Sequence, residues 1–135
     1  MKATELSIGD WIYRPACVDK ITSITTHSIV GLDPLRGSIS LSEVKPIKIT
    51  GKILERNDWE YVDTDEDGAR HYEWGDGKTC FMEWWEKGSA ESALLSYGQG
   101  QTVIIREIPV NTVHELQHVM KLCGFVKEVD DFVID

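Results

Sequence analysis

The chain has 135 residues, of which 41% are hydrophobic and 27% charged, so it can bury the core of one average domain or of two very small ones. It is acidic, with 23 Asp and Glu against 14 Lys and Arg and a formal net charge of -9, and no cluster of basic residues offsets this balance, so nucleic-acid binding is disfavoured. No apolar run approaches the roughly 20 residues of a membrane span, so we expect no membrane association. No signal peptide is visible and the cysteines lack C-x-x-C spacing, so we expect a cytoplasmic protein.

The first part of the chain predicts short strands separated by turns. The expected strands are 11–13, 18–25, 29–32 and 38–41, with a turn at 33–37. Short strands so close in sequence cannot build a large sheet, but they can curl into a small barrel whose near closure protects the strand edges. We therefore expect an SH3-like β-barrel over residues 1–49.

A short helix is expected next, over residues 51–56. Thr50 can cap its first turn, and Asn57 suits its end because asparagine tolerates the left-handed conformation. The segment that follows, 58–85, is rich in aromatic residues and predicts a β-meander. Its strands are expected at 59–62, 70–74 and 79–85, and the pairs Asp67-Gly68 and Asp76-Gly77 fit the tight turns between them.

The remaining elements complete the expected fold. Residues 86–101 fit either a short helix from Ser89 to Leu95 or a loop, and 102–108 predict a strand. The best-defined helix is expected at 112–124, and 125–134 fit a last strand. The predicted class is α+β, with the barrel at 1–49 and a second unit at 50–135, in which the 112–124 helix closes the meander. The two units can also pack as one compact body.

The 112–124 helix contains the string His114-Glu115-Leu116-Gln117-His118, which matches H-E-x-x-H. In a zinc hydrolase, His114 and His118 would hold the metal and Glu115 would activate its bound water. Two features favour a structural role instead. The apolar stripe of the helix leaves both histidines on the opposite side, facing water, and Glu115 can form a capping box with Thr112. We therefore predict no catalytic residue and no cofactor, with zinc at this motif as the alternative.

A second motif, at residues 63–68, resembles the start of a calcium-binding EF-hand loop. The bidentate glutamate needed at position 12 is absent, because Trp74 stands there, and the flanking residues predict strands where an EF-hand has helices. We interpret the segment as a solvated acidic hairpin turn.

The meander also carries candidate binding residues, namely Trp59, Trp74, Trp84 and Trp85. Trp84 and Trp85 are adjacent, so in a strand they point to opposite faces of the sheet. One of them can enter the core while the other is left on the outer face. An exposed tryptophan is a candidate contact for a partner; the alternative is that it packs between the two halves of the chain.

Four segments carry a family resemblance: LSIGDWI at 6–12, LSEVKPI at 41–47, Thr50 with ILERN at 53–57, and VHELQ at 113–117. The chain resembles a family of small uncharacterised proteins from gut Bacteroidetes, often encoded by prophages or other mobile elements. Members tend to have Gly-Phe in place of Asp58-Trp59, and commonly an asparagine in place of His118. The resemblance implies that His118 is incidental, and it brings no catalytic residue.

These observations favour a non-enzymatic binding or adaptor protein that contacts another protein and serves a phage or mobile element. A zinc-dependent hydrolase that uses His114, Glu115 and His118 is one alternative. A nucleic-acid-binding barrel module is the other, and it requires a basic face despite the acidic total. Neither the identity of the partner nor the oligomeric state follows from the sequence.

Overall fold

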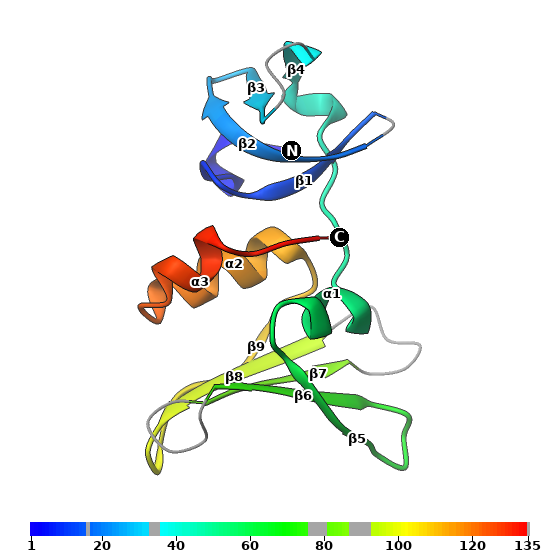
Figure 1. Cartoon of the computed structure of the whole chain (residues 1–135), viewed down its shortest axis with the longest axis vertical. Coiled ribbons are helices and arrows are strands. Elements are labelled where there is room, and N and C mark those ends of the chain that lie inside the picture. The colour runs from blue at the N-terminus through cyan, green and yellow to red at the C-terminus, as the bar shows by residue number, and fades with distance from the viewer. Residues whose placement is uncertain (16, 33–35, 76–80, 87–92, 135) are drawn as a thin grey trace. The chain divides into compact units, whose positions relative to one another are not determined.

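The computed structural model describes residues 1–15, 17–32, 36–75, 81–86 and 93–134 (Figure 1). These residues form two antiparallel sheets, of four and five strands, together with a few short helices, which fits the expected α+β class. The chain divides into two compact units, Met1–Lys48 with Thr112–Ile134, and Ile49–Asn111. No helix among the described residues is both long and apolar enough to cross a membrane.

The sheet of the first unit contains the predicted strands in chain order. They are β1 (Trp11–Arg14), β2 (Cys17–Ile24), β3 (Ser28–Gly31) and β4 (Ser38–Ser40), each antiparallel to the next. Part of the expected 33–37 turn, residues 33–35, lies outside the described residues. A 3-10 helix, Leu41–Glu43, follows β4. After it, Tyr13 and Lys45 exchange two backbone hydrogen bonds, of 2.8 and 3.0 Å. Closure of this sheet into a barrel is not seen in the described part of the chain.

The core of the first unit comes from alternating strand residues. Ile12, Ile21 and Ile29 are each at most 1% exposed and lie on β1, β2 and β3. Leu6, Leu41 and Val44 complete the buried cluster from the segments before and after the sheet. Because successive strand residues point to opposite faces, one apolar residue at every second position is enough to supply one side of a core.

The long C-terminal helix, α2 (Val113–Leu122), belongs to the first unit. It contacts β1. Its fully buried Gln117 accepts a hydrogen bond from the Trp11 amide and donates one to the Gly9 carbonyl, both at 3.0 Å. This placement differs from the expected unit at 50–135, in which the helix was to close the meander. The difference arises because polar contacts to distant backbone hold the helix, and apolar periodicity does not reveal them.

The last segment is a helix, α3 (Val126–Asp130), so the strand expected at 125–134 is wrong. The amides of Val129 and Asp131 donate to the carbonyls of Phe125 and Lys127, four residues earlier, which is the pattern of an α-helix and not of a strand. Gly124 ends the preceding helix with a φ of 95°, a conformation that favours glycine. The chain therefore turns after α2 and returns as helix.

The second unit begins with the predicted helix α1 (Gly51–Arg56), whose first turn is capped by Thr50. The Thr50 hydroxyl accepts a hydrogen bond from the Ile53 amide at 3.3 Å. The left-handed residue expected at Asn57 is instead Asp58, with a φ of 67°. Asn57 keeps a φ of -110°, and its side chain donates to the Ile53 carbonyl at 2.8 Å. The asparagine thus supports the helix end through its amide and not through its backbone.

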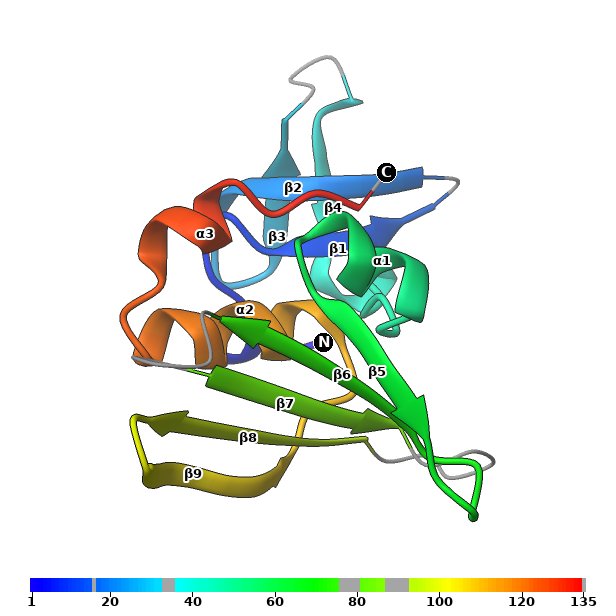
Figure 2. The ribbon, with the colours of Figure 1, turned by 60° about the horizontal axis from the view of Figure 1, so that its bottom comes forward.

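Five antiparallel strands follow in chain order, β5 (Glu60–Thr64), β6 (Arg70–Gly75), β7 (Phe81–Glu86), β8 (Ala93–Gln99) and β9 (Thr102–Pro109) (Figure 2). Asp67-Gly68 lies in the β5–β6 turn as predicted, with Gly68 at a φ of 83°, whereas Asp76-Gly77 lies outside the described residues. Strand β8 takes the place of the helix or loop considered for its part of 86–101, whereas residues 87–92, with Ser89, lie outside the described residues. Its residues Ala93, Leu95 and Tyr97 are buried in alternation, which is typical of a strand.

Candidate functional site

The H-E-x-x-H helix places its two histidines in different surroundings. His114 is buried, with 7% of its surface exposed. His118 is partly exposed, and its Nε2 lies 2.7 and 3.0 Å from the two carboxylate oxygens of Asp10, which is fully buried. The two imidazole rings meet edge to face, with centroids 5.7 Å apart. The expectation that both histidines face water is therefore wrong, because the segment around Asp10 covers that side of the helix.

Glu115 has the capping role that the sequence predicts. Its Oε1 accepts hydrogen bonds from the Thr112 amide at 3.1 Å and from the Thr112 hydroxyl at 2.7 Å. The His114 Nδ1 is 3.3 Å from the same hydroxyl. Burial lowers the pKa of His114 below its usual value, although the nearby Asp10 carboxylate opposes this shift. The groups of the motif are thus engaged in hydrogen bonds that hold the start of α2 and the segment near Asp10.

The acidic turn at 63–68 is organised by one of its own carboxylates. Asp65 Oδ1 accepts hydrogen bonds from the backbone amides of Asp67 and Ala69, both at 2.9 Å. This is the arrangement by which an aspartate closes a turn on itself. The hairpin that we expected at this segment is confirmed.

The four candidate tryptophans divide by burial. Trp59 is 2% exposed and Trp84 is 1% exposed, and the Trp84 indole donates a hydrogen bond to the Val110 carbonyl at 3.0 Å. Trp74 and Trp85 are half-buried. The prediction that Trp84 and Trp85 point to opposite faces is confirmed, because Trp84 pairs across the sheet with the buried Tyr72 and Trp85 pairs with His71. The face of the sheet that carries Trp85 is called the outer face below.

The outer face brings together groups that the sequence analysis did not combine. The imidazole of His71 stacks on the Trp85 ring, with centroids 4.0 Å apart and an interplanar angle of 4°. The ligand atoms of His71, Glu73 and Glu83 all lie within 4.8 Å of one another. The sequence signal was present, since His71 and Glu73 are two residues apart in a predicted strand and so share a face. The position of Glu83 opposite Glu73 depends on the register between β6 and β7, which cannot be read from the sequence.

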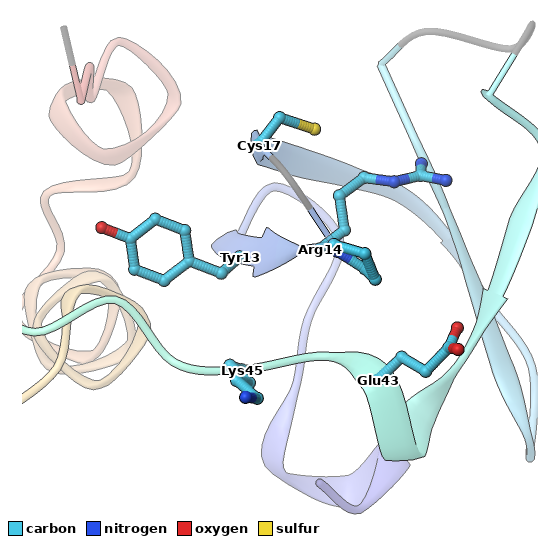
Figure 3. Close-up of a pocket in the computed structure, with 6 residues that line it drawn as sticks. Tyr13, Arg14, Cys17, Glu43 and Lys45 are labelled. Carbon is cyan, nitrogen blue, oxygen red and sulfur yellow. The ribbon is translucent and has the colours of Figure 1, made fainter.

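A surface cavity of about 510 Å³ lies in the first unit beside Tyr13 (Figure 3). Its lining residues come from β1, the following turn, the start of β2 and the segment around the 3-10 helix Leu41–Glu43; they are Tyr13, Arg14, Pro15, Cys17, Glu43 and Lys45. Tyr13 is 46% exposed. The sequence analysis missed this cavity, because no motif marks a hollow formed by distant segments.

The charges at this cavity are not equivalent. The buried Arg14 guanidinium lies 3.1 Å from the Asp19 carboxylate and donates to the Arg36 carbonyl at 2.9 Å, so its charge is already paired. Glu43 and Lys45 are exposed and of opposite sign. The cavity therefore offers one aromatic surface together with an acidic and a basic side chain.

No protein-family model, curated protein or solved structure matches this chain. The function must therefore be argued from the arrangement of these side chains.

Proposed function

We propose that the protein is a non-enzymatic binding module, which takes up an extended segment of a partner protein in the cavity beside Tyr13. The observation that carries the proposal is the cavity itself. Its volume of about 510 Å³ falls within the roughly 300–1,000 Å³ of ligand pockets. A half-exposed tyrosine at its edge supplies apolar area together with a hydroxyl, a combination common at binding surfaces.

The charges of the first unit indicate what kind of segment fits. Among its residues, 1–48 and 112–134, acidic and basic side chains are nearly balanced, so the unit repels neither sign strongly. Lys45 and Glu43 flank the cavity with opposite charges. The fitting partner is an extended peptide that combines an apolar side chain for the Tyr13 surface with one acidic residue for Lys45 and one basic residue for Glu43.

Binding without catalysis is supported by the state of the H-E-x-x-H groups. Glu115 accepts two hydrogen bonds from Thr112, and the His118 imidazole bonds to Asp10. A catalytic base must reach the proton that it removes, whereas Glu115 is held by Thr112 and one of the two ring nitrogens of His118 is held by Asp10. One observation favours the zinc-hydrolase alternative, a cavity of about 400 Å³ whose lining includes His114, Glu115 and His118. Binding to protein is preferred because the hydrogen bonds to Thr112 and Asp10 already engage Glu115 and His118.

The fold that we assign to the first unit is an SH3-like barrel. It is supported by four consecutive antiparallel strands, a 3-10 helix after the fourth, and the Tyr13–Lys45 bridge back to β1. An experimental structure tests the assignment. Pairing of residues 44–48 along the length of β1 would establish a closed barrel, and an open β1 edge would refute it.

The family resemblance supplies the origin that we propose, a prophage or mobile element, and the sparse cysteines without C-x-x-C spacing support the cytoplasmic compartment that we propose. The neighbouring genes test the origin. Integrase or phage structural genes beside this one support it, and a conserved setting among housekeeping genes contradicts it.

A peptide-display selection on the tag-free protein tests the binding function. We expect enrichment of peptides that combine an apolar residue with one acidic and one basic residue. Their affinity, measured by fluorescence anisotropy, should fall at least about tenfold in Tyr13→Ala, since a buried aromatic contact is typically worth more than 1.4 kcal/mol. Lys45→Glu should select peptides in which the acidic position is replaced by a basic one.

Tyr61→Ala is the matched control, because Tyr61 is 48% exposed, close to the 46% of Tyr13, and lies on β5 of the other unit. Its affinity for the selected peptides should equal that of the unchanged chain. Equal affinity in Tyr13→Ala, or a selection that enriches no peptide, overturns the proposed function.

A further inference from the structure

The outer face of the five-stranded sheet holds three metal-ligating side chains at one place. His71 and Glu73 stand two residues apart on β6, and Glu83 on β7 is the direct cross-strand partner of Glu73. Their ligand atoms lie within 4.8 Å of one another. Ligands about 2.1 Å from a tetrahedral ion lie roughly 3.4 Å apart, so small movements of the two glutamate side chains would bring the set around one ion.

His71 supplies a second, independent observation. It is 7% exposed, and its Nε2 is buried without a hydrogen-bond partner in the structure. This nitrogen lies 3.6 Å from Glu73 Oε1, so it is directed at the acidic pair but is too distant for a hydrogen bond. A buried polar atom without a partner costs roughly as much as a lost hydrogen bond, and a bound ion or a water is one way in which such an atom is satisfied.

The imidazole is held in a fixed orientation. Its ring lies flat against Trp85, with an interplanar angle of 4°. On its other nitrogen, Nδ1, the Asp63 carboxylate is 3.7 Å away. In metal sites a histidine ligand commonly has a carboxylate or carbonyl at the nitrogen that faces away from the ion, and this partner orients the ring. Asp63 lies on that side of the ring, but 3.7 Å is too long for a hydrogen bond, so the stacking on Trp85 is the contact that orients the imidazole.

The two glutamates have an electrostatic reason to share a cation. Like charges at directly opposite positions of an antiparallel pair destabilise a sheet, and Glu73 faces Glu83 in this way. The surrounding unit adds to the effect, because residues 49–111 and 135 hold 14 of the 23 acidic residues of the chain but only 6 of its 14 basic ones. A divalent cation placed between the carboxylates would remove their repulsion and lower the excess of negative charge.

We infer that His71, Glu73 and Glu83 form a binding site for a divalent transition-metal ion of the zinc class. One imidazole nitrogen with two carboxylate oxygens suits Zn²⁺, Mn²⁺, Fe²⁺ or Co²⁺ better than Ca²⁺ or Mg²⁺, which prefer oxygen ligands alone. The bound ion links neighbouring strands β6 and β7 and satisfies the buried Nε2. This site is separate from the H-E-x-x-H histidines and from the peptide cavity beside Tyr13, and it does not depend on the proposed function.

Equilibrium dialysis of tag-free protein against Zn²⁺, with elemental analysis of the retained metal, tests the site. We expect saturation at one ion per chain. Glu73→Gln and Glu83→Gln should each weaken the affinity at least about tenfold, as expected when a ligand is lost. Both side chains are outside the core, so these variants fold even if His71→Ala does not. Substitution with Co²⁺ gives a second readout, a visible absorption band that both variants should lose.

Two control variants separate this site from zinc binding elsewhere on the chain. Glu66→Gln removes one exposed carboxylate from the β5–β6 turn, and His118→Asn removes the second histidine of H-E-x-x-H; neither should change the affinity. Loss of zinc in His118→Asn would move the site to α2 and overturn the inference. Equal weakening in Glu66→Gln, or binding that does not saturate, would show only diffuse attraction to acidic residues and would also overturn it.

Thermal unfolding of the unchanged chain and of Glu73→Gln, each with and without zinc, gives a further test. Without metal, Glu73→Gln should be at least as stable as the unchanged chain, because one of two opposed charges is gone. With zinc, the unchanged chain should gain stability as the ion binds the folded state, and the variant should not. No zinc-dependent rise in the unchanged chain would mean that His71 forms only ion pairs with its carboxylate neighbours, which would overturn the inference.

Discussion

Replacement of Gln117 tests how the long C-terminal helix is held in the first unit. Its side chain is fully buried and joins two backbone groups more than a hundred residues earlier, the Trp11 amide and the Gly9 carbonyl, through 3.0 Å hydrogen bonds. Gln117→Leu nearly keeps the volume of the side chain but leaves both backbone groups without their partner. Gln117→Ala leaves the same two groups unpaired and adds a cavity.

The expected loss follows from these contacts. An unsatisfied buried group costs about 1–3 kcal/mol, and the lower end applies because both hydrogen bonds are only partly buried. Gln117→Leu should therefore lower the free energy of unfolding by about 2 kcal/mol. Gln117→Ala should lower it by roughly 3–4 kcal/mol, since the cavity adds lost packing. Against a total stability of about 5–15 kcal/mol, either loss is large.

Urea unfolding measures both variants beside Gln101→Ala, an exposed glutamine in the β8–β9 turn that should change stability by less than about 0.5 kcal/mol. Amide hydrogen exchange adds a local readout. The Trp11 amide should exchange faster in Gln117→Leu, by roughly tenfold for each 1.4 kcal/mol lost. If Gln117→Leu matches the unchanged chain in both measurements, the helix is held by its apolar contacts alone and the reasoning fails.

Three further changes test other parts of the structure. Burial lowers the pKa of His114 below its usual 6.5, so at acid pH the unfolded chain binds a proton more readily than the folded chain. The free energy of unfolding therefore keeps its full value above about pH 6.5 and falls as the pH drops below it, by up to about 1.4 kcal/mol per pH unit. Between pH 7.5 and 5.5 the free energy of unfolding, measured with urea, should fall less in His114→Gln than in the unchanged chain. An equal fall in both would contradict this. In Gly31→Ala the new Cβ collides with the Asp19 carboxylate that pairs with Arg14, so the free energy of unfolding should fall by about 2 kcal/mol or more, and an unchanged melting temperature would refute the packing. Thr112→Ala removes the cap of α2 and should cost about 1 kcal/mol in the same assay, whereas no loss would show that the cap is dispensable.

Local patterns predicted the elements whose signals are contained in a few neighbouring residues. The cap at Thr50, the capping box at Thr112 and Glu115, and the turn at Asp67-Gly68 each require one hydrogen-bonding side chain or one glycine at a fixed offset. The first-unit strands followed from alternating apolar residues. These features were predictable because the contacts that form them are made within a few residues of sequence.

The errors fall where distant contacts decide the structure. Strand β8 contains alanine, serine and glycine, which favour strands weakly, yet pairing with β7 and β9 on both sides makes it a central strand. The apolar residues of 125–134 suggested a strand, but the segment forms helix α3, which contacts α2. In both places tertiary packing overrides an ambiguous local preference.

The two histidine sites show why a sequence motif is weaker evidence for a metal site than the hydrogen bonding of the ligand atoms. H-E-x-x-H has the right spacing, but Glu115 is bonded to Thr112 and the His118 nitrogen to Asp10. His71 belongs to no motif, yet its Nε2 is buried, unpartnered and directed at two opposed carboxylates. A ligand binds where it satisfies atoms that the fold leaves unsatisfied, and it must displace existing hydrogen bonds elsewhere. Zinc should therefore prefer the outer face of the sheet to the helix, although only the helix carries a zinc-binding string.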